Sequence, residues 1–156
     1  MALPLPKGHP RAMVQRGSSL IEIAVVLGVI TVALGIAVPG FRHALDAYAA
    51  AAGRDAVITM AARARAVAIA HGGADLTIDT DSGLARIEAD GAAPVLIALG
   101  DRFGVQLVIE SSGRTEVTIH YDGIGLGRLA NVSLLVRKGN ARARVIFSMY
   151  GRPRRA

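Results

Sequence analysis

Residue types that often serve in catalysis or metal binding occur in this chain, but their spacing fits neither role. The chain has no cysteine, which excludes disulfides, thiolate zinc sites, iron–sulfur clusters and cysteine nucleophiles. It contains no Gly-x-Ser-x-Gly elbow and no HExxH pattern. Its four histidines show no metal-ligand spacing: His9, His43, His71 and His120. We therefore expect no enzymatic activity and no cofactor.

Two further clusters resemble binding sites but lack their defining residues. The string GIGLG at residues 123–127 lacks the Lys-Ser/Thr ending of a phosphate loop, and it does not clearly open a helix. A loop between strands is the favoured interpretation. Asp75, Asp79 and Asp81 crowd a predicted strand and turn, but their spacing does not fit an EF-hand calcium loop. A solvated turn is the favoured interpretation there.

The junction at residues 16–22, with the sequence RGSSLIE, carries the strongest chemical signal. Gly17 has no side chain, so a protease can hold the backbone closely at this point. Glu22 places a carboxylate at the entrance of an apolar segment. A carboxylate in the membrane interior costs roughly 2.5–3.5 kcal/mol on insertion scales. Glu22 therefore needs either a positively charged partner or access to the lipid headgroups.

The apolar segment that follows has no charged residue between positions 23 and 41, and Leu20 and Ile21 extend it. A run of about 20 apolar residues can span a bilayer as a helix. A helix in the core of a soluble protein usually keeps a polar face, which this segment lacks. It is also longer than the 7–15 apolar residues of an ordinary secretory signal. We therefore expect a retained membrane span.

The charges before the span predict its orientation. Lys7, Arg11 and Arg16 precede it, and residues 1–17 contain no acid. Positive residues stay on the cytoplasmic side, so the N-terminus is expected in the cytoplasm and the C-terminal part outside it.

Beyond the span, the sequence predicts a second helical segment. Pro39, followed by Gly40, is expected to kink or loosen the helix. The helical pattern resumes over residues 42–70 and has a plausible stop at His71. The expected apolar stripe of this segment is Leu45, Ala49, Ala52, Ala56, Met60, Arg63 or Ala64, and Val67.

From residue 75 the apolar period changes to two, which is typical of strands. The predicted strands are 75–79, 84–88, 95–99, 105–110, 116–121, 132–137 and 142–148. Short strands separated by turn residues indicate an antiparallel β domain. The expected fold class is α+β: a long N-terminal helix, first transmembrane and then amphipathic, packed on a C-terminal antiparallel β domain.

Charge is unevenly distributed along the chain. Residues 18–122 carry a net −5, whereas residues 123–156 carry a net +8 and no acid. Such a basic end can meet phosphates or acidic surfaces. A solvated strand face followed by a frayed terminus is the alternative.

The junction and the span resemble the class III leader of type IV pilins and of type II secretion pseudopilins. The resemblance covers residues 16 to about 41. It implies that a prepilin peptidase cuts between Gly17 and Ser18 and that Ser18 is then N-methylated. It also implies that Glu22, the fifth residue after the cut, pairs with the terminal amine of a neighbouring subunit. Pro39 matches a proline usual in this family, whereas Ser18 departs from the usual Phe.

With this resemblance, the chain divides into four expected parts. Residues 1–17 form a cleaved leader, residues 18–41 a transmembrane and assembly helix, residues 42–73 an amphipathic helix, and residues 74–156 a periplasmic antiparallel β domain. The expected location is the bacterial inner membrane, with a single pass, a cytoplasmic N-terminus and a periplasmic C-terminal domain.

The remainder resembles the H-type minor pseudopilins and the related T-type minor pilins (the GspH/FimT-like family), which implies a pilin-like fold. The matching segments are residues 63–66, residues 121–128, and the final strand with Gly151-Arg152-Pro153-Arg154. The implied function is that of a minor pseudopilin, a structural subunit of the periplasmic pseudopilus that supports protein export. The implied partners are other major and minor pseudopilins, the prepilin peptidase, the inner-membrane assembly platform, membrane lipid and secreted cargo. The alternative is a T-type minor pilin that binds DNA through its basic C-terminus, at Arg152, Arg154 and Arg155.

Overall fold

The computed structural model describes residues 19–110, 113–128 and 131–156. The chain divides into two compact units, Met1–Val38 and Pro39–Ala156, which are described separately below. The helix α1 (Leu20–His71) supplies the described secondary structure of the first unit and opens the second. Pro39 lies inside α1, so helical structure resumes after it. The predicted bend at Pro39 stays a prediction.

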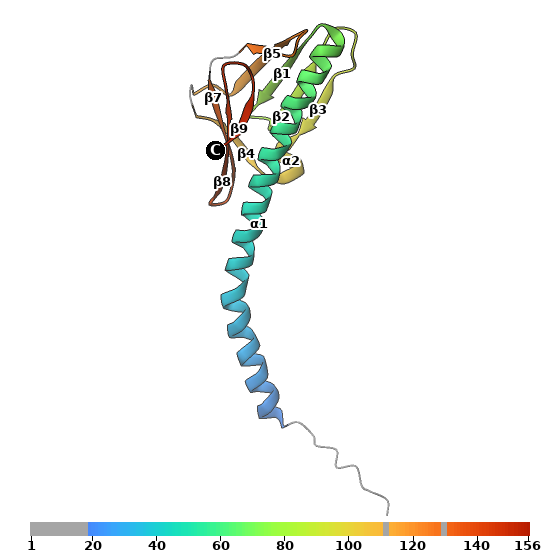
Figure 1. Cartoon of the computed structure of the whole chain (residues 1–156). Helices are drawn as coiled ribbons and strands as arrows, with labels where there is room; N and C mark the ends of the chain where they lie inside the picture. The colour runs from blue at the N-terminus through green and yellow to red at the C-terminus, as the bar shows by residue number, and fades with distance from the viewer. Residues whose placement is uncertain (1–18, 111–112, 129–130) are drawn as a thin grey trace, which may run out of the picture. The chain divides into compact units, whose positions relative to one another are not determined.

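In the second unit, α1 lies alongside the strands (Figure 1) and ends where the sequence predicts. Gly72 follows with φ +85°, a left-handed conformation that glycine adopts without strain and that closes many helices. The chain then enters β1 (Gly73–Asp79) directly.

The buried face of α1 overlaps the predicted stripe in part. Of the predicted residues, Met60 and Ala64 are fully buried, and Ala49, Ala56 and Val67 are partly buried against the core, whereas Leu45 is 51% exposed. The fully buried residues of α1 are Ala50, Gly53, Val57, Met60, Ala61, Ala64 and Ala68. This face is mostly alanine and glycine, so the helix can approach the strands closely. A Cβ on Gly53 would lie 3.0 Å from a methyl group of Val136.

The strands form two antiparallel sheets, which confirms the predicted α+β class. The first sheet has the order β3-β2-β1-β5-β6. Its further members are β2 (Leu84–Glu88), β3 (Val95–Ala98), β5 (Glu116–Asp122) and β6 (Gly127–Arg128). The second sheet has the order β4-β7-β8-β9. Its members are β4 (Gln106–Ile109), β7 (Val132–Lys138), β8 (Ala141–Phe147) and β9 (Pro153–Arg155).

Three short elements are absent from the sequence prediction. The helix α2 (Leu99–Phe103) begins at a residue that was predicted to end a strand. The two-residue strand β6 pairs with β5, and β9 pairs with β8. The pairing of Ile146 with Arg154 places the basic C-terminal segment at the edge of a sheet. Of the alternative interpretation, the solvated strand face is therefore confirmed, whereas a frayed terminus is wrong for residues 153–155.

A single hydrophobic core joins the second half of α1 to the inner faces of both sheets. In the part of the chain that the structure describes, the fully buried hydrophobic residues lie between Ala50 and Phe147. The largest buried side chains include Tyr121, Phe147 and Met60. Because this core lies wholly within residues 42–156, that part of the chain has what it needs to fold independently. We call residues 42–156 the head.

Candidate functional site

The described part of the predicted leader junction begins at Ser19, which caps the start of α1. The Ser19 carbonyl accepts hydrogen bonds from the backbone N–H groups of Glu22 (2.9 Å) and Ile23 (3.3 Å). The Ser19 hydroxyl accepts one from the N–H of Ile21 at 3.3 Å. Serine is a preferred residue at this position because its oxygen satisfies a free N–H of the first turn. The predicted cleavage and methylation sites, Gly17 and Ser18, lie outside the described residues.

Glu22 lies in the first turn of α1, where the positive end of the helix dipole favours a carboxylate. It is exposed, and no described residue forms an ion pair with it. The geometry leaves its carboxylate open to a partner outside the chain.

The apolar part of α1 is not covered by its own chain. All residues from 19 to 45 are exposed, including Leu20 at 88% and Ile36 at 75%. Among the described residues, α1 is the one helix long and apolar enough to cross a membrane, and its most apolar 18-residue window has a mean hydropathy of 2.6. Leaving one large apolar side chain in water forgoes roughly 1.5–3 kcal/mol. A segment with thirteen such side chains between Leu20 and Phe41 therefore needs lipid or other helices around it.

Within the head, the three segments that carry the GspH/FimT-like resemblance come together. A cavity of about 200 Å³ is lined by residues of α1, of the loop after β5 and of the turn before β9, among them Arg65, Gly125 and Gly151. Gly125 has φ +76°, and a Cβ there would lie 2.8 Å from the Cγ of Arg65. Arg63, the other arginine of the first segment, is exposed and does not line the cavity.

Tyr121 connects two of these segments from inside the core. Its hydroxyl donates a 2.7 Å hydrogen bond to the carbonyl of Gly151. Burial raises the pKa of Tyr121 to about 12, and the positive charge of Arg65 opposes this rise only in part. Tyr121 is therefore a neutral donor at any ordinary pH, and it anchors the turn that leads into β9.

Two glycines bring the backbones of the loop and the turn together. The N–H of Gly127 donates to the carbonyl of Tyr150 at 3.1 Å. A Cβ on Gly127 would lie 2.7 Å from the Cα of Gly151, which is too close for any side chain. The Asp122 carboxylate holds the same loop by accepting hydrogen bonds from the N–H groups of Ile124 and Leu126. Residues 123–126 of the GIGLG string thus form a loop between β5 and β6, as predicted, and Gly127 begins β6.

The three candidate C-terminal arginines differ in their surroundings. Arg155 forms an ion pair with Asp55 of α1 at 3.3 Å. The pKa of Asp55 is lowered, first by its hydrogen bond with Arg54 and also by the charges of Arg54 and Arg155. Arg152 and Arg154 are exposed and form no ion pair with any described residue.

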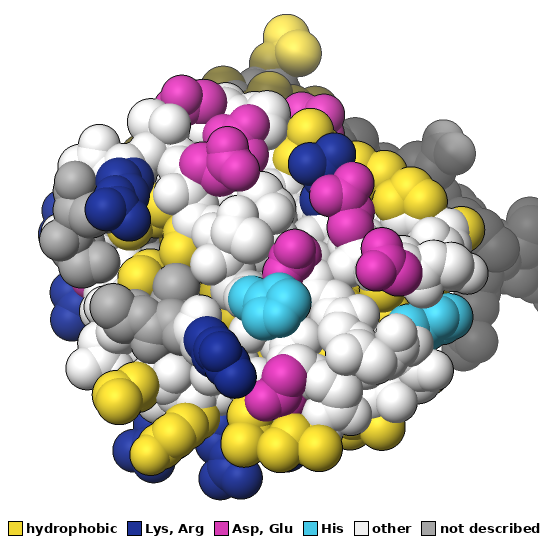
Figure 2. Space-filling view, turned by 90° about the horizontal axis from the view of Figure 1, so that it is seen from above, with side chains coloured by type: hydrophobic (Ala, Val, Ile, Leu, Met, Phe, Trp, Pro, Cys, Tyr) yellow, Lys and Arg dark blue, Asp and Glu magenta, His cyan; other side chains and the backbone are white. Residues whose placement is uncertain are grey.

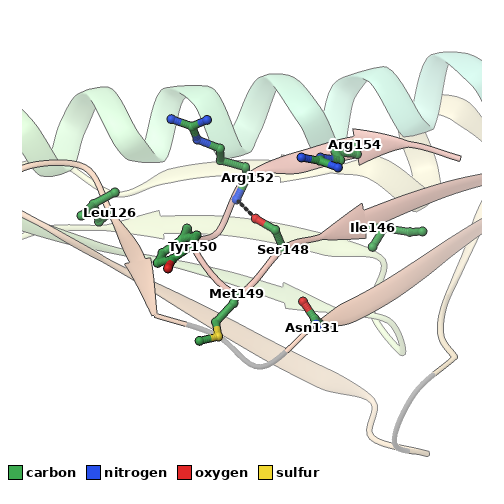
Figure 3. A pocket seen from close by; sticks show the side chains of 8 residues that line it. All are labelled: Leu126, Asn131, Ile146, Ser148, Met149, Tyr150, Arg152 and Arg154. Atoms are coloured by element: carbon green, nitrogen blue, oxygen red, sulfur yellow. Dashed lines mark hydrogen bonds between the residues drawn. The ribbon is translucent and has the colours of Figure 1, made fainter.

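Arg152 and Arg154 border an open groove of about 850 Å³ (Figure 3). The backbone N–H of Arg152 donates to the Ser148 hydroxyl at 3.2 Å, which fixes the turn between β8 and β9. Met149 and Tyr150 on this turn are 60% and 61% exposed. The sequence analysis identified the arginines but missed these two apolar neighbours, because a turn of four residues has no periodicity to mark them.

Three of the histidines and acids considered above as metal ligands, His120, Asp75 and Asp79, have local partners. His120 lies 2.6 Å from the Asp75 carboxylate across the β1–β5 pair. Asp79 accepts hydrogen bonds from the N–H groups of Asp81 and Ser82 and from the Ser82 hydroxyl. These hydrogen bonds, the Ser82 hydroxyl first, lower the pKa of Asp79. In the parts of the chain that the structure describes, no group of three or more such residues is placed to hold a metal ion.

Comparison of the chain with models of protein families, with curated proteins and with solved structures gives no match.

Proposed function

We propose that this chain is a minor pseudopilin of a type II secretion system, a non-enzymatic structural subunit at or near the tip of a periplasmic pseudopilus. One observation carries the proposal. A helix that is apolar on every side and uncovered by its own chain leads into a folded head, and a single carboxylate stands at its start. Such a helix suits two environments in turn, first a lipid bilayer and then a bundle of similar helices.

The convergence of the three resembling segments in the head supports the same proposal. Arg65, the loop after β5 and the turn before β9 are far apart in the sequence but line one cavity. In this proposal, the chain is processed by a prepilin peptidase and anchored in the inner membrane with the head in the periplasm. It then joins other major and minor pseudopilins through the assembly platform, and its head contacts secreted cargo.

A second candidate function is DNA binding during uptake by a type IV pilus. The specific observation in its favour is that Arg152 and Arg154 border a groove that also contains the exposed ring of Tyr150. Arginines contact phosphates, and an exposed aromatic ring can stack on a base. Arg155 contributes less to this surface because it is paired with Asp55.

A gel-shift of the head with duplex DNA separates the two candidates. Under the DNA alternative, the head binds at low salt, and its affinity falls steeply as salt rises. Replacing both Arg152 and Arg154 by alanine is expected to remove most of this binding and to lower the salt dependence by about one unit of slope per phosphate contact.

Arg63→Ala is the matched control, because Arg63 is exposed on α1 and does not border the groove. Absence of binding at low salt excludes the DNA alternative. Binding that survives the double replacement excludes these arginines as its site.

A further inference from the structure

The outer faces of the two sheets in the head carry opposite charge. In the first sheet, buried and exposed residues alternate along β1, β2 and β5, so every second side chain points away from the core. The outward carboxylates are Asp75, Asp79, Glu88 and Glu116, against the arginines Arg86 and Arg128. Asp81 and Asp90 add two exposed acids on turns beside this face. We call this surface the acidic face.

The outer face of the second sheet carries mostly positive charge. The strand β8 reads Ala-Arg-Ala-Arg-Val, and its arginines alternate with buried residues. Across β7, β8 and β9, the outward positions include Arg137, Arg142, Arg144 and Arg154, together with Ser133, Leu135 and Ile146. Among these, Arg144 pairs with Glu110 at 2.9 Å. We call this surface the basic face.

One pair of arginines on the basic face forms no ion pair with any residue that the structure describes. Arg137 and Arg142 are directly opposite each other in the β7–β8 register. Like charges in such a pair are destabilising. In addition, the Nε of Arg137 is buried, and no hydrogen-bond partner for it exists among the described residues. A carboxylate supplied from outside would offset both charges.

The acidic face offers carboxylates around a hollow, where Glu88 pairs with Arg86 at 3.2 Å and Asp75 lies 2.6 Å from His120. A depression of about 530 Å³ is lined by Asp75, Glu88 and Asp90, together with His71 and His120. Figure 2 looks down on the head and shows acidic side chains grouped around a histidine, with most Lys and Arg side chains toward the edge of the view. The hollow is concave and acidic, so it can receive side chains that project from a basic surface.

We propose that the basic face of one copy of this chain docks on the acidic face of a second copy, with Arg137 and Arg142 directed at Asp75 and Glu88. The two faces are different surfaces of the same molecule, so the contact is head-to-tail. Contacts of this kind can repeat from copy to copy and build an open chain. A second copy is favoured over a nucleic acid because the head itself carries the acidic hollow that complements its arginines.

The size of the faces predicts a weak contact. A sheet of four strands about 4.8 Å apart and about 20 Å long offers roughly 400 Å². Burying such an area on each partner gives a total of about 800 Å², which is below the roughly 1,200–2,000 Å² of standard specific interfaces and in the range of weak, transient contacts. Anchoring of the copies in one membrane would raise their effective concentration and strengthen the contact. The proposal concerns the head alone, so it does not depend on the system to which the protein belongs.

The contact is tested by charge reversal on the head, residues 42–156. The head is purified free of nucleic acid, and its self-association is measured by sedimentation. At low salt, the average mass of the wild-type head is expected to rise with protein concentration and to return to that of a monomer at high salt. The variant D75K/E88K has two basic faces, and the variant R142E/R154E has an acidic second sheet. Neither variant alone is expected to associate. An equal mixture of the two is expected to associate at least as well as wild type.

R42E/R63E is the control that matches R142E/R154E in the size of the charge change, because Arg42 and Arg63 are exposed on α1, outside both sheets. It should leave association unchanged. A wild-type head that stays monomeric at low salt and high concentration overturns the proposal. So does self-association that either double variant retains, or a mixture that fails to restore it. If the monomeric head instead binds an oligonucleotide and R142E/R154E abolishes that binding, the basic face serves nucleic acid.

Discussion

Replacing Glu22 by alanine is expected to exclude the chain from pseudopilus filaments while leaving it in the membrane. The apolar segment that follows Glu22 keeps its full length, so insertion loses nothing. Removal of the carboxylate even spares the roughly 2.5–3.5 kcal/mol that a charge costs in the membrane interior. In the filament, however, the terminal amine of the neighbouring subunit would lose its partner. Breaking a buried ion pair costs about 3–5 kcal/mol, which corresponds to a loss of incorporation of about 100-fold or more.

The measurement compares two fractions from cells that produce the chain together with the other pseudopilins. Filaments are isolated and probed for the wild-type chain, Glu22→Ala and Glu22→Gln, and the amount of each in the membrane is measured in parallel. Glu22→Gln keeps the shape and a hydrogen-bonding oxygen but not the charge, so it is expected to incorporate poorly as well. Incorporation of Glu22→Ala at the wild-type level would show that this carboxylate has no role in assembly. Failure of the wild-type chain to co-isolate with filaments would contradict the pseudopilin proposal itself.

Replacing Gly151 by alanine is expected to destabilise the head by about 2–5 kcal/mol. Gly151 has φ +69°, and a residue with a side chain loses roughly 1–2 kcal/mol in this conformation. Its added methyl group would also lie 2.9 Å from the Cα of Gly127 and 3.0 Å from the ring of Tyr121. Overpacking a site that cannot yield costs typically another 1–3 kcal/mol.

The variant Gly91→Ala separates the conformational cost of a positive φ from the cost of overpacking. Gly91 has nearly the same φ, +72°, but a Cβ there meets no atom within 4 Å. Denaturant unfolding of the head should show only the conformational cost for Gly91→Ala and the larger loss for Gly151→Ala. Equal losses in the two variants would mean that the close contact between the loop after β5 and the turn before β9 does not stabilise the head.

Most strands of the head could be predicted because one side of each sheet is buried and the other is exposed. In β1, the buried residues Ala74, Leu76 and Ile78 alternate with polar ones, which gives the period of two directly. The bounds of β2 agree with the prediction at both ends. The two-residue β6 and the three-residue β9 are too short to show a period. They form because longer neighbours, β5 and β8, offer them hydrogen-bonding edges.

The buried face of α1 could be predicted only in part, for a different reason. The middle of the helix is so rich in alanine that several faces have nearly equal hydrophobicity. The close approach of Gly53 to Val136 and the small volume of Ala61 and Ala64 select the observed face. That selection depends on the shape of the sheets, which the local sequence does not contain.

Some features of the candidate site could likewise be predicted from the sequence, and others could not. The apolar span and Glu22 are visible in the sequence, because their signal is composition over a contiguous stretch. The hydrogen bond from Tyr121 to Gly151 and the acidic and basic faces become visible only with the strand register. The excess of positive charge in residues 123–156 and the alternation of arginine with apolar residues in β8 are sequence signals that point to the basic face.

The most direct test concerns the mass and the location of the chain in cells that contain a prepilin peptidase. After alkaline extraction, the chain is expected in the membrane fraction, and mass spectrometry is expected to show loss of the first 17 residues, with Ser18 at the new N-terminus. In cells without the peptidase, the full-length chain should remain in the membrane. Recovery of the intact chain from the soluble fraction, with the peptidase present, would contradict both the membrane anchor and its processing.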